Sequence, residues 1–351
     1  MSRFLSEDLK NLVPYTPGEQ LLGKFIKLNT NESPFPPSPK VLKALGEVEV
    51  SKLNLYSDPT ADVLVSAIAD FYDMNKENVA VGNGSDEILA FIFRAFGKRG
   101  FVCPTITYGF YPVFADFFCI ELDTIPLNSK LEINLDDYYS TKRNIIIANP
   151  NAQTGTYLQK DEIEKLVASD SNRLVVVDEA YIDFGGETVA PLTNKYDNLL
   201  VVQTFSKSRS LAGGRVGFAL GCKDLIADIN TMKFSFNPYN VNRLSIIAGS
   251  EAISDKEYFA ECTQKVINVR ESVKVELKAL GFELTDSKAN FVLAKHKDIE
   301  GKELYLKLKE RGILVRYLGG DISEYVRITI GSEEQMKTFI HHVKEIILSK
   351  I

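Results

Sequence analysis

Short runs of β-branched and other apolar residues recur through the middle of the chain, separated by stretches with helical spacing. Continuous apolar runs are typical of strands that are covered on both faces, as in parallel sheets. The runs span residues 79–81, 144–147, 174–178, 199–203 and 216–220. Their alternation with helical patterns predicts an α/β fold, with a large domain in which helices flank a mostly parallel sheet.

The pattern changes after the turn-forming residues 237–240, Asn-Pro-Tyr-Asn. A long helical pattern then runs from about residue 255 to 280 and ends at Gly281. Three strands and two helices are expected beyond it, at residues 290–294, 302–310, 313–316, 325–330 and from 333 onward. Mixed short strands and helices of this kind predict a smaller α+β domain.

Three parts follow from these patterns. We expect an N-terminal arm at residues 1–30 that partly joins the small domain, a large ligand-binding domain at 31–240 and a small C-terminal domain at 241–351. The proline-rich residues 34–39 cannot form a regular helix or a central strand, so they predict an ordered extended segment.

Composition narrows the function classes. The 351 residues are 45% hydrophobic, which can supply a sizeable core, and the net charge of −6 argues against nucleic acid as a partner. Acidic residues near the N-terminus and the lack of a long apolar run predict a cytoplasmic protein without a membrane segment. The four cysteines show no Cys-x-x-Cys spacing and the three histidines have no catalytic setting, so no metal site is expected.

Lys207 is the first candidate for chemistry. It follows the apolar run 199–203 and precedes the glycine-rich residues 211–215. A lysine that forms an imine must reach its neutral form, which neighbouring cations favour, and Arg209 and Arg215 are candidates for these. An isolated Ser-Lys pair is more often a solvated surface lysine, so the interpretation depends on partners.

Asp178 supplies such a partner because it ends the apolar run 174–178. Ligands of open α/β sheets bind outside the carboxyl ends of the strands. A carboxylate there can hold the proton on the ring nitrogen of pyridoxal 5′-phosphate, and Tyr181 can donate to the phenolate oxygen of this cofactor. The alternative is that Asp178 only caps the segment that follows it.

A glycine turn, Gly82-Asn83-Gly84-Ser85-Asp86, lies between a predicted strand and a helical pattern. Free N–H groups and the helix dipole make such a turn an anion site, to which Ser206 and Arg215 would add a hydroxyl and a guanidinium. Ser85 and Asp86 could instead be N-caps alone. Tyr108 is a candidate for stacking on the cofactor ring or for the core.

With these residues, the chain resembles the histidinol-phosphate aminotransferases of fold type I, which use pyridoxal phosphate. The resemblance runs through residues 14–19, 28–34, 81–89, 176–184, 204–215 and 326–331. It implies that Lys207 forms the cofactor imine, Asp178 pairs with the pyridinium and Tyr181 contacts the phenolate oxygen. Residues implied at the phosphate or ring are Gly84, Ser85, Asp86, Tyr108, Thr204, Ser206 and Arg215. In similar enzymes a tyrosine matching Tyr56 reaches the phosphate from the other subunit, which implies a homodimer with shared active sites.

One segment departs from the family. It usually reads Asn-Pro-Asn-Asn-Pro-Thr-Gly, whereas residues 149–155 read Asn-Pro-Asn-Ala-Gln-Thr-Gly. The asparagine that contacts the phenolate oxygen would be Ala152. We expect Asn151 to reach in through a shifted loop; the alternative is that Tyr181 makes this contact alone.

The implied reaction is transamination between histidinol phosphate and 2-oxoglutarate or glutamate, in histidine biosynthesis. Candidate substrate-binding residues are Tyr15, Asn29 or Asn31, Arg316 and Arg327, because guanidinium groups suit carboxylate and phosphate. An aromatic amino acid aminotransferase or a threonine-phosphate decarboxylase would use the same machinery. A dinucleotide-dependent oxidoreductase and a catalytically silent binding protein are the alternatives from other classes.

Overall fold

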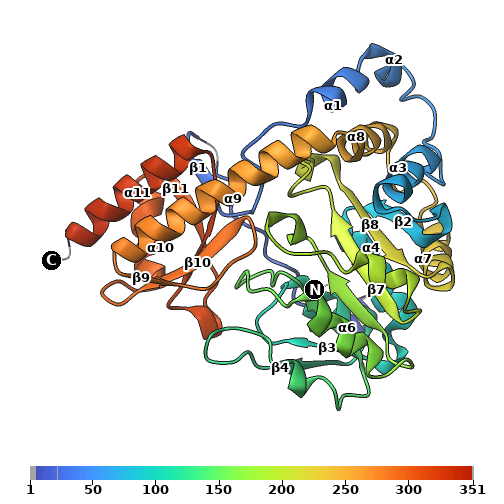
Figure 1. Ribbon diagram of the computed structural model, residues 1–351, viewed down its shortest axis with the longest axis horizontal. Coiled ribbons are helices and arrows are strands. Elements are labelled where there is room, and N and C mark those ends of the chain that lie inside the picture. Colours follow the sequence, from blue (N-terminus) through green and yellow to red (C-terminus); the bar gives the residue numbers. More distant parts are fainter. Residues whose placement is uncertain (1–4, 22, 350–351) are drawn as a thin grey trace.

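Two sheets organise the computed structural model, which describes residues 5–21 and 23–349 (Figure 1). Residues 1–4 of the expected arm, residue 22 and residues 350–351 of the expected small domain lie outside the described residues. The larger sheet has seven strands. Their spatial order is β2 (Val79–Asn83), β8 (Val216–Gly221), β7 (Leu199–Thr204), β6 (Val175–Asp178), β5 (Asn144–Ala148), β3 (Phe101–Pro104) and β4 (Leu122–Ile125).

The larger sheet is mostly parallel, as its sequence pattern predicts. Only β8 runs antiparallel to its neighbours β2 and β7. Every residue of β5, β6, β7 and β8 is buried, because helices cover both faces. In β6, Val175 and Val177 pack into the cluster formed with α3 (Asp62–Tyr72), α6 (Lys160–Ala168) and α8 (Arg243–Ser254). Val176 faces α4 (Ser85–Phe96), α5 (Phe110–Phe118) and α7 (Lys223–Phe236) on the other side.

The smaller sheet has five strands, in the order β1 (Ile26–Leu28), β11 (Ile313–Tyr317), β12 (Val326–Thr329), β10 (Phe291–His296) and β9 (Phe282–Leu284). It packs with α9 (Lys256–Ala279), α10 (Gly301–Glu310) and α11 (Glu333–Leu348) around a separate apolar cluster. Helix α9 is long and extends from this unit toward α8 (Figure 1). No helix among the described residues is long and apolar enough to cross a membrane.

The N-terminal arm enters the smaller sheet through β1, which pairs in parallel with β11 at the sheet edge. The three-part division of the chain stays a prediction. Helix α8 lies beyond residue 240 but packs against α1 (Pro39–Ala44) and α3. This packing favours a boundary between α8 and α9 rather than at residue 240.

Candidate active site

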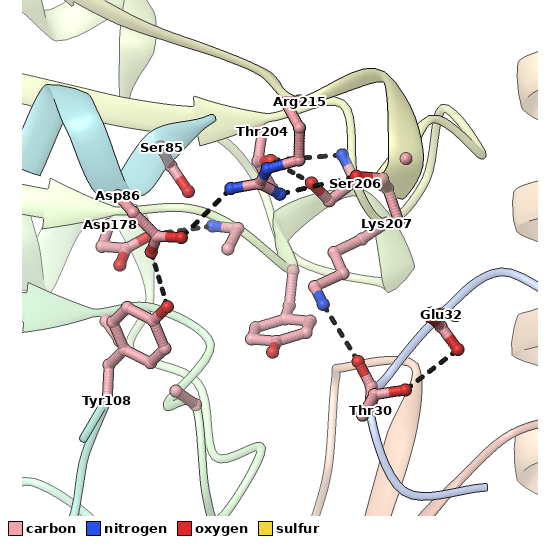
Figure 2. Close-up of a pocket in the computed structure, with 16 residues that line it drawn as sticks. Thr30, Glu32, Ser85, Asp86, Tyr108, Asp178, Thr204, Ser206, Lys207 and Arg215 are labelled. Carbon is pink, nitrogen blue, oxygen red and sulfur yellow. Dashed lines mark hydrogen bonds and ion pairs between the residues drawn. The ribbon is translucent and has the colours of Figure 1, made fainter. Parts of the chain in front are cut away.

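A cavity of about 330 Å³ lies where strands β6 and β7 end, beside the start of α4 (Figure 2). This is the position where open α/β sheets bind their ligands. Nine of the predicted site residues line it: Ser85, Asp86, Tyr108, Asp178, Tyr181, Thr204, Ser206, Lys207 and Arg215. Gly84 adjoins the cavity as the residue before α4.

Lys207 extends across this cavity from the loop after β7. The loop turns tightly because the Ser206 N–H donates to Thr204 Oγ1 at 3.1 Å and the Leu211 N–H donates to the Phe205 carbonyl at 3.0 Å. Lys207 Nζ donates to the carbonyl oxygen of Thr30 at 3.2 Å (Figure 2). No carboxylate pairs with Lys207 among the described residues, so its amine can be reached by an electrophile.

Asp178 is the last residue of β6 and is only 4% exposed. Its carboxylate accepts hydrogen bonds from the Tyr111 hydroxyl at 2.9 Å and from the Ala180 N–H at 3.2 Å. Burial raises the pKa of Asp178 to about 6, although these two hydrogen bonds act in the opposite direction. A buried carboxylate without a cationic partner suits a ligand that brings a protonated nitrogen.

Tyr111 was not among the predicted site residues. Its side chain is fully buried on α5, and its hydroxyl holds one oxygen of Asp178. The sequence offered only an aromatic residue three positions after Tyr108, which is equally typical of a core.

The glycine turn forms an anion cup at the start of α4. Gly84 has a positive φ of 78° and no side chain to cap the helix, so the first N–H groups are available to a ligand. A Cβ atom at Gly84 would lie 2.3 Å from Arg215 Nη2. A Cβ atom at Gly217 would lie 2.2 Å from the Ser85 nitrogen. Gly217 was missed, although a glycine inside a buried strand signals a close backbone approach.

Asp86 introduces a negative charge into this cup. Its carboxylate accepts from the Tyr108 hydroxyl at 2.6 Å and from Arg215 Nη2 at 3.2 Å (Figure 2). These bonds orient the guanidinium and fix the tyrosine ring. The carboxylate itself would repel an anion. Asp86 can therefore contribute to anion binding only through its backbone N–H and by orienting Arg215.

The family of this chain is identified by its similarity to known proteins. A family described as aminotransferase class I and II matches residues 23–343. The chain belongs to this family. It is therefore a pyridoxal phosphate-dependent aminotransferase. The histidinol-phosphate aminotransferase of Brachyspira hyodysenteriae is 52% identical to it over 352 residues, covering 99% of each chain. That of Clostridium botulinum strain 657 is 48% identical over 351 residues, with the same coverage.

Solved structures show the same fold. The histidinol-phosphate aminotransferase of Clostridium acetobutylicum aligns with a TM-score of 0.86 at 23% identity, covering 92% of this chain and 99% of that one. The Sinorhizobium meliloti enzyme, solved in complex with pyridoxal 5′-phosphate, aligns with a TM-score of 0.85 at 23% identity, covering 93% and 92%. The aminotransferase thus has the fold type I architecture that the sequence predicts.

Besides Gly84, two predicted cofactor residues of the aminotransferase do not line the cavity. Asn151 is fully buried, and its side chain donates to the Ile106 carbonyl and accepts from the N–H groups of Gln153 and Thr154. The loop is not shifted toward the cavity, which Ala152 lines instead. Tyr56 is 79% exposed and stacks on Tyr239 with ring centroids 4.5 Å apart.

The predicted substrate residues of the aminotransferase lie close to the cavity without lining it. Tyr15 stacks on Phe110 at 4.4 Å between ring centroids. Arg316 donates to the carbonyl groups of Thr16 and Pro17 in the arm. Tyr15 is part of the N-terminal arm, and these hydrogen bonds attach Arg316 to it.

Arg327 donates to the Ala152 carbonyl at 2.9 Å and to Gln153 Oε1 at 2.8 Å. Both partners are neutral, and no carboxylate pairs with Arg327 among the described residues. Loss of hydration lowers the pKa of Arg327 from its usual value. Gln153, which the sequence did not single out, therefore helps to hold a guanidinium that has no anionic partner.

Proposed function

We propose that this aminotransferase transfers an amino group between histidinol phosphate and 2-oxoglutarate, with glutamate as the other amino compound, in histidine biosynthesis. One observation carries the chemistry: Lys207, the buried Asp178 and the Arg215 cup face one cavity. The substrate assignment is supported by full-length relatives of that name at 52% and 48% identity. A cytoplasmic location stays a prediction.

The residues of the cavity fit the cofactor. Asp178 offers an unpaired buried carboxylate to a pyridinium nitrogen, and the N–H groups at the start of α4, with Ser206 and Arg215, offer donors to a phosphate. Tyr108 and Tyr181 bring aromatic rings and hydroxyl groups to the wall of the same cavity. When bound, the cofactor supplies an electron sink for a bond at the substrate α-carbon.

Lys207 has two roles in this proposal. Its amine would hold the cofactor, and the free amine is placed to take the proton from the substrate α-carbon. The Thr30 carbonyl accepts a hydrogen bond from the free amine and so keeps it within the cavity. We expect borohydride to abolish the visible absorbance band of the purified protein and to leave the cofactor covalently attached to Lys207, as detected by peptide mass spectrometry; attachment to another residue would contradict the assignment.

Arg327 is the proposed anion-binding residue of the substrate site. Its guanidinium has neutral partners only, so a substrate carboxylate or phosphate would supply the missing charge. Arg316, bound to two carbonyl groups of the arm, is proposed as the second such residue.

We expect Arg327→Ala to raise KM for glutamate and for histidinol phosphate by at least about tenfold, which corresponds to one lost ionic hydrogen bond. The visible absorbance of the bound cofactor should be unchanged. Equal loss of cofactor and activity would instead indicate a role in folding.

A homodimer with shared active sites is the third part of the proposal. Tyr56 is 79% exposed and does not line this chain's own cavity. Its sequence neighbours Leu53 and Leu55 are exposed as well. Exposed apolar side chains are frequent at interaction surfaces, and a second subunit that bound at this segment would receive Tyr56 at its own site.

Substrate choice is decided by steady-state kinetics. With 2-oxoglutarate as the acceptor, we expect kcat/KM for histidinol phosphate to exceed that for phenylalanine and tyrosine by at least about 100-fold, because an unmet phosphate site is costly. Fold does not separate these reactions, since a threonine-phosphate decarboxylase of Porphyromonas gingivalis aligns with a TM-score of 0.79. Release of CO₂ from threonine phosphate would indicate that second reaction.

A further inference from the structure

Asn31 is held by four hydrogen bonds in the arm that leads out of β1. Its N–H donates to Thr329 Oγ1 at 3.0 Å, and its carbonyl accepts from Asn290 Nδ2 at 3.0 Å. Its side-chain Oδ1 accepts from Thr329 Oγ1, and its Nδ2 donates to the Tyr181 hydroxyl, both at 3.0 Å. Asn31 is buried and adopts a positive φ of 54°, which asparagine tolerates better than most residues.

Thr329 fixes which way the Asn31 amide faces. A threonine hydroxyl has one hydrogen to donate. Thr329 Oγ1 accepts from the Asn31 N–H, and among the described residues the one acceptor for its own hydrogen is Asn31 Oδ1. An amide turned the other way would leave this hydrogen without an acceptor. The Nδ2 group must therefore face Tyr181.

This orientation makes Tyr181 a donor toward the cavity. Its hydroxyl oxygen accepts from Asn31 Nδ2, which leaves the hydroxyl hydrogen for a second acceptor. Tyr181 is buried and lines the cavity, with its ring packed edge-on against Phe291. The side chain has little freedom to turn away.

The same side of the cavity lacks a polar group at position 152. Ala152 lines the wall and brings only a methyl group. Asn151 cannot replace the missing amide, because its own amide is engaged with the surrounding backbone. The amide of Asn31 reaches this region through Tyr181.

We propose that Asn31 is a positioning residue, which directs the Tyr181 hydroxyl to the phenolic oxygen of the cofactor and so replaces the asparagine that position 152 lacks. The inference rests on the proposed use of pyridoxal 5′-phosphate at this site. It also gives Asn31 a role other than the substrate contact that the sequence suggested.

The test is a pH titration of the visible absorbance of the holoenzyme. A donor to the phenolic oxygen favours the deprotonated chromophore, so its loss should move the titration midpoint upward. We expect Asn31→Asp, which removes the donor but keeps the shape and the backbone conformation, to raise the midpoint by about one pH unit. Tyr181→Phe should do the same, and the double variant should shift no further than Tyr181→Phe.

Thr329 provides a matched pair of variants. Thr329→Val, which removes the hydroxyl that orients the amide, should raise the midpoint, whereas Thr329→Ser should leave it unchanged. Unshifted midpoints in folded Asn31→Asp and Thr329→Val, or additive shifts in the double variant, would overturn the inference alone. A wild-type protein in which borohydride attaches no cofactor to Lys207 would overturn it together with the proposed function.

Discussion

Asp178 combines burial with the absence of a cationic partner among the described residues. Burial raises its pKa from 3.8 to about 6, so the folded protein without cofactor holds this proton more tightly than the unfolded chain does. The neighbouring Glu179 is raised by burial to a pKa of about 7. Both carboxylates therefore cost stability once they ionise, and for Asp178 a ligand cation can offset this cost.

Ionisation of Asp178 should lower the stability of the apoenzyme as pH rises from about 4 to about 6, and Glu179 should extend the fall to about pH 7. For Asp178 the raised pKa corresponds to a loss of about 3 kcal/mol in the free energy of unfolding. This loss is complete above pH 6 and absent below pH 4. We expect Asp178→Asn to flatten this part of the curve in urea unfolding. The same variant should lose at least about 100-fold in kcat, because it cannot hold a pyridinium proton. If Asp178→Asn left the pH dependence of stability unchanged, Asp178 would not be a carboxylate that destabilises the apoenzyme when it ionises.

Gly84 permits the close approach of Arg215 to the start of α4. Because a Cβ atom would meet Arg215 Nη2 and φ is positive, Gly84→Ala should displace the guanidinium and raise the Kd for pyridoxal phosphate by at least about tenfold. Gly213→Ala is the control: Gly213 also lines the cavity, but no atom lies within 4 Å of its added Cβ. Fluorescence titration with pyridoxal phosphate should show a higher Kd for Gly84→Ala than for Gly213→Ala. Equal Kd values would contradict the proposed phosphate site at the start of α4.

Site residues that follow directly after a strand could be predicted from the sequence. Asp178 and Lys207 were predicted to meet because the carboxyl ends of neighbouring parallel strands share one edge. The contact between Asn31 and Tyr181 joins residues 150 positions apart, so no local pattern signals it. Asn151 was expected at the cavity because of its residue type, whereas the turn uses its amide to satisfy the backbone.

At the scale of elements, the strands predicted in the larger sheet are long apolar runs that are buried along all or nearly all of their length, such as β5 and β7. Strands β3 and β4 were missed: β3 ends in a proline, and β4 exposes two of its four residues. The three-residue strand β1 is too short to show a period. Strand β1 forms because residues 26–28 pair with β11, a contact between distant parts of the chain that the local sequence does not indicate.

Strand β1 anchors the arm through Leu28, which is buried among the apolar residues of the smaller sheet. Leu28→Ala should destabilise the protein by about 2–4 kcal/mol, measured by urea unfolding, because it leaves a cavity there. It should also weaken the positioning of Thr30 and Asn31 and so lower kcat. Leu42→Ala, at a largely exposed position on α1, should change stability by less than about 0.5 kcal/mol. Equal effects would show that β1 does not anchor the arm.

For the whole molecule, the proposed shared site predicts subunit complementation. Tyr56→Ala and Lys207→Ala should each be nearly inactive alone, since each removes one part of every site. After the two are mixed, unfolded and refolded together, half of the dimers should be hybrids with one intact site, giving about a quarter of wild-type activity. Absence of recovery, with dimers confirmed by light scattering, would argue that Tyr56 serves its own chain.

The pairing of β1 with β11 has a consequence for synthesis of the chain. Ile26 is made long before its partner Ile313. The large domain can fold on the ribosome while Thr30 and Asn31 still lack the sheet that places them beside Lys207 and Tyr181. We therefore expect a nascent chain to acquire a competent active site only after β11 has emerged, so that ribosome stalling before residue 313 yields a folded domain without activity.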